Sequence, residues 1–231
     1  MALESLSWAQ QTQVNALLEQ VKRRFHRFTT QEREVFTTLW MSIARVGMPV
    51  PIHPAPIHNI TNMMAVVAQL EQRGLLWLDV DMQAVLQCPP FSAIRTNHLV
   101  KAFGWNAAYA CTLADVPLTL LLYGPNAWLE IKTICHETGS PLTFSVLLDE
   151  HRHLHLETPD EAADWRVWIP HSIIDQPPSI ERDVGLFATC DALDAYCAKH
   201  PEQEGVSYSI NEAILLSEAL ILAYKQALSN S

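Results

Sequence analysis

Cys111 and Asp115 are the residues whose types and spacing best suit chemistry in this chain. A cysteine acts as a nucleophile or metal ligand only as the thiolate, so its neighbours decide what it can do. The two positions are four residues apart, and on a helix this spacing puts both side chains on one face. A carboxylate placed there can exchange a proton with a species bound to the sulfur. Buried cysteines also serve as small apolar core residues, so the pair alone leaves a packing role open.

The other thiols fit structural roles better than catalytic ones. Five cysteines are an odd and sparse set for 231 residues, so a disulfide framework is not expected. No Cys-x-x-Cys pair occurs, which argues against a zinc site of the usual spacing. We expect a core thiol at Cys135, and core or near-surface free thiols at Cys88, Cys190 and Cys197.

A cluster of histidines is a weaker candidate for metal binding. His151, His153 and His155 alternate along the chain, so a strand would present all three on one face to a transition metal. Charged neighbours such as Asp149 and Arg152 favour a solvated strand edge instead. The pattern leaves both interpretations open.

The elements that must position Cys111 lie in the second part of the chain. A helix is expected from Asn106 onward, and it would contain Cys111. Alternating apolar residues and capping patterns predict two long strands, a short buried strand and a helix at residues 142–148, 165–169, 184–188 and 191–199. Ser209 and Glu212 form a capping-box pattern at the start of the last helix. Strands with segregated helices indicate an α+β fold with a mixed sheet and packed helices.

The first part of the chain reads as three helices followed by a short strand, which is the order of a winged helix. The helices and the strand are expected over residues 8–28, 29–47, 59–73 and 75–80. Thr29 and Glu32 would form a capping box, and the prolines of residues 48–58 exclude a helix there. We therefore divide the chain into a winged-helix-like domain at 1–86 and an α+β catalytic domain at 87–231.

The winged-helix order raises the question of DNA binding. The basic residues Lys22, Arg23, Arg24 and Arg27 lie on the first helix, whereas the third helix, which would enter the groove, offers only Arg73. The net charge of −10 also opposes contact with phosphates over most of the surface. A nucleic-acid partner is therefore not expected.

Composition places the chain among globular proteins. Apolar residues make up 49% and charged residues 17%, and no apolar run reaches the roughly 20 residues that a membrane span requires. The N-terminus lacks a basic region and a hydrophobic stretch, so we expect no signal peptide. These features predict a cytoplasmic protein without a membrane partner, and they leave its oligomeric state open.

Several short motifs between residues 90 and 225 resemble those of the alkylmercury (organomercurial) lyases. Their order and spacing carry the resemblance more than any one motif does. They are Pro90-Phe91-Ser92, Tyr109-Ala110-Cys111, Asp115, Leu121-Leu122-Tyr123-Gly124, Cys135, Thr138-Gly139-Ser140-Pro141, Tyr196-Cys197-Ala198-Lys199-His200 and Glu204-Gly205. A winged-helix-like segment before the catalytic domain also fits that family.

The resemblance implies protonolysis of a carbon–mercury bond. In that family two cysteine thiolates take the mercury, and an aspartate passes a proton to the leaving carbon, as a soft metal and a carbanion-like group require. The first cysteine corresponds to Cys111, which would also be the mercury ligand. The family's aspartate follows that cysteine by three positions, where this chain has Ala114. It corresponds to Asp115 if one residue is inserted.

The second catalytic cysteine has no counterpart at the matching position. That position falls at or beside Glu181, and no cysteine occurs within residues 179–188. Glu181 can act as an acid or a hard ligand, but a carboxylate does not replace a thiolate in holding mercury. The resemblance therefore implies an atypical member of the family.

Three hypotheses follow. The leading one is a lyase acting on a small organomercurial at Cys111 and Asp115, with no dissociable cofactor and with mercury bound only as substrate or product. The second keeps the fold and uses Glu181 in a non-mercury hydrolase, lyase or cyclase reaction on a small organic molecule. The third is a non-catalytic, metal-responsive DNA-binding regulator.

Overall fold

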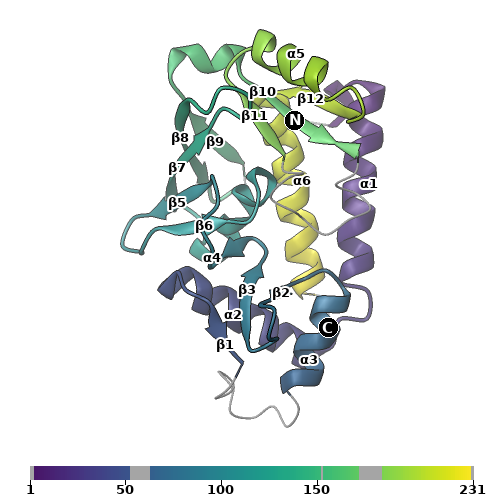
Figure 1. The fold of residues 1–231 in the computed structure, drawn as a ribbon, viewed down its shortest axis with the longest axis vertical. Helices are drawn as coiled ribbons and strands as arrows, with labels where there is room; N and C mark the ends of the chain where they lie inside the picture. Colours follow the sequence, from purple (N-terminus) through teal and green to yellow (C-terminus); the bar gives the residue numbers. More distant parts are fainter. Residues whose placement is uncertain (1–2, 53–62, 152, 172–183, 230–231) are drawn as a thin grey trace.

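A computed structural model describes residues 3–52, 63–151, 153–171 and 184–229 of the chain. Helices pack against antiparallel sheets, which confirms the expected α+β class (Figure 1). The α-helices are α1 (Trp8–Arg24), α2 (Thr30–Val46), α3 (Met63–Gln72), α4 (Leu120–Tyr123), α5 (Cys190–Lys199) and α6 (Ile210–Ser229). The 3-10 helices are η1 (Leu3–Ser5), η2 (Leu113–Asp115), η3 (Pro117–Thr119) and η4 (Asp160–Asp164).

The larger sheet has nine strands in the order β1-β3-β4-β6-β5-β7-β8-β9, with β2 paired to β3 outside this path. Its strands are β1 (Val50–Pro51), β2 (Trp77–Leu78), β3 (Ala84–Cys88), β4 (Phe91–Ser92), β5 (Leu99–Ala102), β6 (Ala108–Ala110), β7 (Trp128–Ile134), β8 (Pro141–Leu148) and β9 (Leu154–Glu157). The predicted domain boundary after residue 86 falls within β3, and the division into domains stays a prediction.

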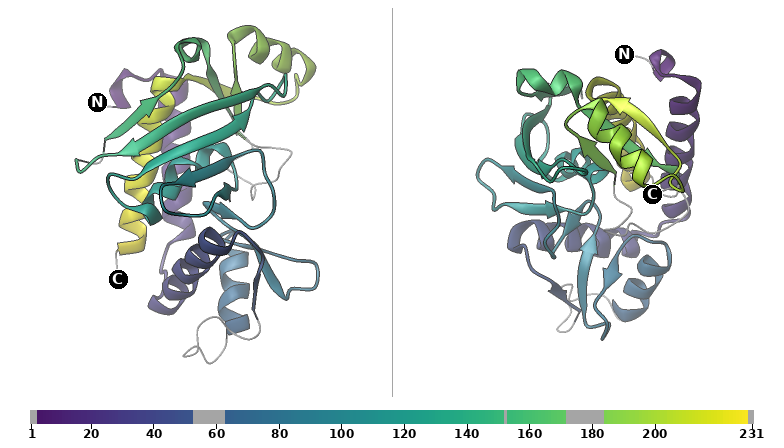
Figure 2. Two further views of the ribbon diagram at one scale, coloured as in Figure 1. Left: turned by 90° about the vertical axis from the view of Figure 1, so that its left-hand side faces the viewer. Right: turned by 45° about the horizontal axis from the view of Figure 1, so that its top comes forward.

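The described strand pairings are all antiparallel, which corrects the expectation of a mixed sheet. Neighbours such as β3 and β4, or β7 and β8, are joined by short connections that reverse the chain, whereas parallel neighbours need a long crossover. A smaller sheet has the order β11-β10-β12. Its strands are β10 (Arg166–Pro170), β11 (Gly185–Phe187) and β12 (Gly205–Ser209). Helix α5 lies beside this sheet (Figure 2).

Two capping boxes begin helices where the sequence predicts them. The Thr29 hydroxyl accepts from the Glu32 amide at 3.1 Å, and the Glu32 carboxylate accepts from the Thr29 amide at 2.8 Å. Ser209 and Glu212 make the same reciprocal pair at the start of α6. Helix α2 ends at Gly47, which adopts a left-handed conformation with φ of 66°.

Helix α6 occupies the centre of the molecule, with α1 on one side and the β8–β9 region of the larger sheet on the other (Figure 1). A buried network ties α1 to the smaller sheet. The Tyr208 hydroxyl donates to Gln13 Oε1 at 2.8 Å, and Gln13 Nε2 donates to the Ile169 carbonyl at 2.8 Å. Within the described residues, no helix is both long and apolar enough to cross a membrane.

Two sequence expectations about helices are wrong. Cys111 does not lie in a helix, because residues 108–110 form strand β6, paired on one side with β4 and on the other with β5. These pairings override the helical preference of a run rich in alanine. Helix α1 ends at Arg24 rather than near Phe28, since Arg27 has a φ of 53° and begins a turn into the capping residue Thr29.

Candidate functional site

Cys111 lies directly after β6 and is held against β4. Its amide donates to the Pro90 carbonyl at 3.0 Å, and its thiol donates to the Phe91 carbonyl at 3.1 Å. The side chain is buried, with 6% of the residue exposed. The pairing of β6 with β4, which rules out the predicted helix, therefore also fixes the position of the Cys111 sulfur.

The Cys111 cavity is the small space of about 80 Å³ beside this residue. One wall is polar and comes from the segment between β4 and β5, namely Arg95, Thr96, Asn97 and His98. The remaining described lining residues are Ile134, His136, Val184 and Leu186. The cavity lining thus combines hydrogen-bonding side chains, including those of His98 and His136, with apolar ones, which is an environment that can bind a small, partly apolar molecule.

Two histidines of this cavity were not found from the sequence. His98 is buried, and its Nδ1 lies 2.9 Å from the Thr133 hydroxyl on β7. His136 follows β7, and its ring lies 5.0 Å from that of Tyr196 on α5. Neither position stands out in spacing or motif, because strand pairing and helix docking bring them to Cys111.

Asp115 ends the 3-10 helix η2 and is buried, with 7% exposed. Its Oδ2 accepts hydrogen bonds from the Thr112 amide at 3.0 Å and from the Thr112 hydroxyl at 2.8 Å. Asp115 lines a second cavity of about 70 Å³ together with Arg24 and Tyr224, not the Cys111 cavity. The structure therefore places the two predicted residues on either side of Thr112, the N-cap of η2, and they line different cavities.

Charged and polar groups from three elements meet around Asp115. Burial raises the pKa of Tyr224 to about 12, while the charge and a hydrogen bond of Arg24 act to lower it. The charge of Asp115 acts in the opposite direction and raises the same pKa. Helix α1, through Arg24, and helix α6, through Tyr224, thus contribute to the electrostatic environment of this carboxylate.

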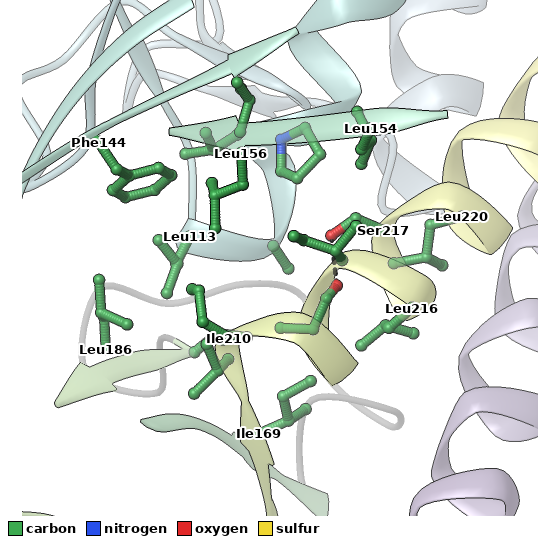
Figure 3. Close-up of a pocket in the computed structure, with 18 residues that line it drawn as sticks. Leu113, Phe144, Leu154, Leu156, Ile169, Leu186, Ile210, Leu216, Ser217 and Leu220 are labelled. Atoms are coloured by element: carbon green, nitrogen blue, oxygen red, sulfur yellow. Dashed lines mark hydrogen bonds between the residues drawn. The ribbon is translucent and has the colours of Figure 1, made fainter. Parts of the chain in front are cut away.

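A third cavity, here called the apolar cavity, lies between α6, the β8–β9 strands and the smaller sheet (Figure 3). It measures about 70 Å³. Leu113, Phe144, Leu156 and Leu220 are among the side chains that point into it in Figure 3. Ser217 is the one polar side chain among the described residues that line this space.

Glu181 lies outside the described residues, so the structure places two of the three predicted site residues, Cys111 and Asp115. Val184, the first described residue after Glu181, lines both the Cys111 cavity and the apolar cavity. Leu186 on β11 does the same. The two cavities therefore share a wall.

The other cysteines differ in environment. Burial raises the pKa of the Cys88 thiol well above its usual value, so this residue is a protonated core thiol. Cys190 is exposed, and Cys197 is half-buried, with its pKa raised by burial and by Asp194. Burial also acts to raise the pKa of Cys135. Hydrogen bonds from Thr138 and from backbone amides, including that of Ala188, outweigh it and lower this pKa overall.

Two histidines of the cluster lie close to carboxylates beside the edge strand β9. His155 Nε2 lies 2.8 Å from Asp149 Oδ2, and His153 Nδ1 lies 3.8 Å from Glu218. His151 lies in the turn before β9. Across the described parts of the chain, no group of three or more His, Cys, Asp or Glu residues is arranged to hold a metal ion. The solvated-edge interpretation is therefore the one that these contacts favour.

Three of the five basic residues considered for DNA contact, namely Lys22, Arg24 and Arg73, lie against other groups of the protein. Arg73 Nε lies 3.0 Å from the buried Glu32, and its guanidinium also donates to the carbonyls of Arg24 and His26. Lys22 lies 2.5 Å from Glu19 on the surface of α1. Arg24 lines the cavity beside Asp115. These contacts give no support to a phosphate-binding face.

The geometry defines an α+β protein with a buried thiol beside a small cavity. Among solved structures, the chain is similar to the crystal structure of the mercury-bound form of MerB2, with a TM-score of 0.64 and 20% sequence identity. The similarity covers 91% of this chain and 99% of the MerB2 chain, so the protein has a MerB-like fold over nearly its whole length. No family model and no curated protein sequence matches the chain.

Proposed function

We propose that the protein is an alkylmercury-lyase-like enzyme that cleaves the carbon–mercury bond of a small organomercurial by protonolysis. The observation that carries this proposal is the placement of Cys111, a buried thiol lining a cavity, in a fold shared with a mercury-bound protein. The motif resemblance around residues 90–141 supports the same activity independently of the fold. We place the reaction in the cytosol, where thiols stay reduced.

In the proposed reaction the Cys111 thiol passes its proton to the Asp115 carboxylate as its sulfur binds the mercury of an R–Hg group. The carbon–mercury bond then breaks, its electron pair stays with the carbon, and the proton on the Asp115 carboxyl bonds to that carbon to release R–H. Mercury(II) remains on the Cys111 sulfur, and Asp115 is again a carboxylate. An external thiol completes the coordination of the mercury and removes it, since a soft metal prefers thiolate ligands.

Asp115 takes the role of acid because it is a buried carboxyl group four residues after Cys111. Thr112 stands between the two residues, and its hydroxyl donates to Asp115 Oδ2. Asp115 and Cys111 line different cavities, so the carboxyl group has to turn from its own cavity toward the sulfur. The proposal therefore needs a conformational change at Asp115 during the reaction.

Release of ethane from ethylmercury chloride, measured by headspace gas chromatography in the presence of excess cysteine, tests this function. We expect catalytic turnover by the wild-type protein and none by Cys111→Ser. The matched control is Cys190→Ser, which removes an exposed thiol and should keep the wild-type rate. Ethane release by the wild-type protein no faster than by cysteine alone would refute the proposal, and so would an active Cys111→Ser variant.

A further inference from the structure

We infer that the apolar cavity is a binding site for a short, uncharged alkyl group of about two to four carbons. This inference rests on the proposed function, because it assigns the cavity to the organic group of the substrate. The cavity of about 70 Å³ is roughly half the size of the ~150 Å³ cavity known to admit benzene. A short alkyl chain therefore fits, whereas an aromatic ring needs the walls to move.

The chemistry of the walls determines the class of ligand. Ser217, the polar member of the described lining, already donates its hydroxyl to the Ala213 carbonyl at 2.7 Å (Figure 3). A carboxylate placed here would lose its water without gaining a hydrogen bond from the described side chains, and an amine could regain only what the Ser217 oxygen accepts. The cavity therefore selects hydrocarbon over carboxylate- or amine-bearing groups.

The position of the cavity links it to Cys111. Leu113 and Ala114 line it and follow Cys111 by two and three residues. Val184 and Leu186 form the wall that it shares with the Cys111 cavity. The organic group of a mercurial held on the sulfur would enter the apolar space by displacing the side chains of this shared wall. Cys111 would hold the metal, and the apolar cavity would hold the carbon chain.

The first test needs no mercury and no activity. Xenon is added to the full-length protein carrying labelled Ile and Leu methyl groups, and methyl chemical shifts are followed by NMR. We expect xenon-dependent shifts at Ile214 and Leu216, because dry apolar cavities bind xenon. Ala213→Leu should abolish them by filling the cavity, while Ala219→Leu on the same helix, at a residue that does not line it, should leave them unchanged.

The second test measures chain-length preference. For propylmercury the Ala213→Leu variant should raise KM about tenfold, because the buried methylenes lose their space, while methylmercury is handled as by the wild type. Ala219→Leu should change neither. If Ala213→Leu does not fold, Leu216→Ala enlarges the same cavity, and the preference should move toward longer chains.

The two proposals can fail separately. A wild-type protein that binds xenon at these methyl groups but turns over no mercurial would overturn the lyase function and leave the hydrocarbon site in place. The inference itself is overturned if xenon leaves Ile214 and Leu216 unshifted. It is equally overturned if Ala213→Leu and Ala219→Leu affect propylmercury alike.

Discussion

The sulfur of Cys111 donates a hydrogen bond to the Phe91 carbonyl, and that bond exists only while the thiol carries its proton. A thiolate accepts hydrogen bonds and cannot donate one, so the reactive form needs donors in its place. Arg95 and Asn97 are donors that line the same cavity. A Cys111 thiolate would therefore have to exchange the Phe91 carbonyl for donors such as these.

The position of Glu181 gives a prediction for a single residue. Replacing it with cysteine should raise the ethylmercury turnover at least tenfold, because a second thiolate binds mercury far better than a carboxylate does. Glu181→Gln is the matched control, since it removes the charge without adding sulfur. Ethane release by the two variants should be compared at saturating substrate. Equal rates would mean that this position does not hold the metal.

The β8–β9 connection carries the clearest pH dependence among the elements. Hydrogen bonds from His155 and from the His153 amide hold the pKa of Asp149 at about 2, below its usual value of 3.8. A carboxyl group with a depressed pKa stabilises the fold above its unfolded pKa, and this contribution is lost as the pH falls through the folded value.

We therefore expect the wild-type protein to lose thermal stability more steeply than Asp149→Asn between about pH 4 and pH 2. Above pH 5 the wild-type protein should be the more stable of the two, because only the ionised carboxylate pairs with His155. Melting temperatures across this range, followed by circular dichroism, measure the difference. Parallel curves for the two proteins would contradict the role given to Asp149.

The network between α1 and the smaller sheet predicts a strong coupling. Tyr208→Phe leaves the buried Gln13 amide without its donor and should cost about 1–3 kcal/mol of unfolding free energy. In a Gln13→Leu background the same change should cost much less, because the partner is already gone. Urea unfolding of the two single variants and the double variant gives the coupling energy. Additive costs would show that the network does not tie α1 to the sheet.

Elements marked by a capping motif or by alternating apolar residues were predictable from the sequence, as the start of α2 and strands β8, β10 and β11 show, whereas strand β6 carries no such mark. Thr29 and Glu32 satisfy each other within one turn, so their motif alone locates the start of α2. Residues 108–110 look helical in isolation and become a strand only because β4 and β5 lie on either side. The same distant pairing brings His98 and His136 to Cys111. For that reason the sequence pointed to Cys111 but not to the histidines that line its cavity.

For the molecule as a whole, helix α6 has two roles that conflict: it stabilises the fold, and it forms part of the walls of two cavities. It is the central helix of the fold, and it also borders both the apolar cavity and the cavity beside Asp115 through Leu220. An unfilled apolar space lowers stability in proportion to its volume, since its lining side chains lose packing partners. A sequence selected for stability alone would fill it. An unfilled cavity that lowers stability is expected where the cavity binds a ligand.

We therefore expect Ala213→Leu, the variant that blocks alkyl binding, to be more stable than the wild-type protein. Filling the cavity with Ala213→Leu should raise the free energy of unfolding by about 1–2 kcal/mol, provided that the added atoms occupy the empty volume. Ala219→Leu adds the same atoms on another face of α6 and should change stability by less than about 0.5 kcal/mol. Urea unfolding of both variants measures the difference. A destabilised Ala213→Leu would show that the walls are already packed too tightly for added atoms and that the space is not available to a ligand.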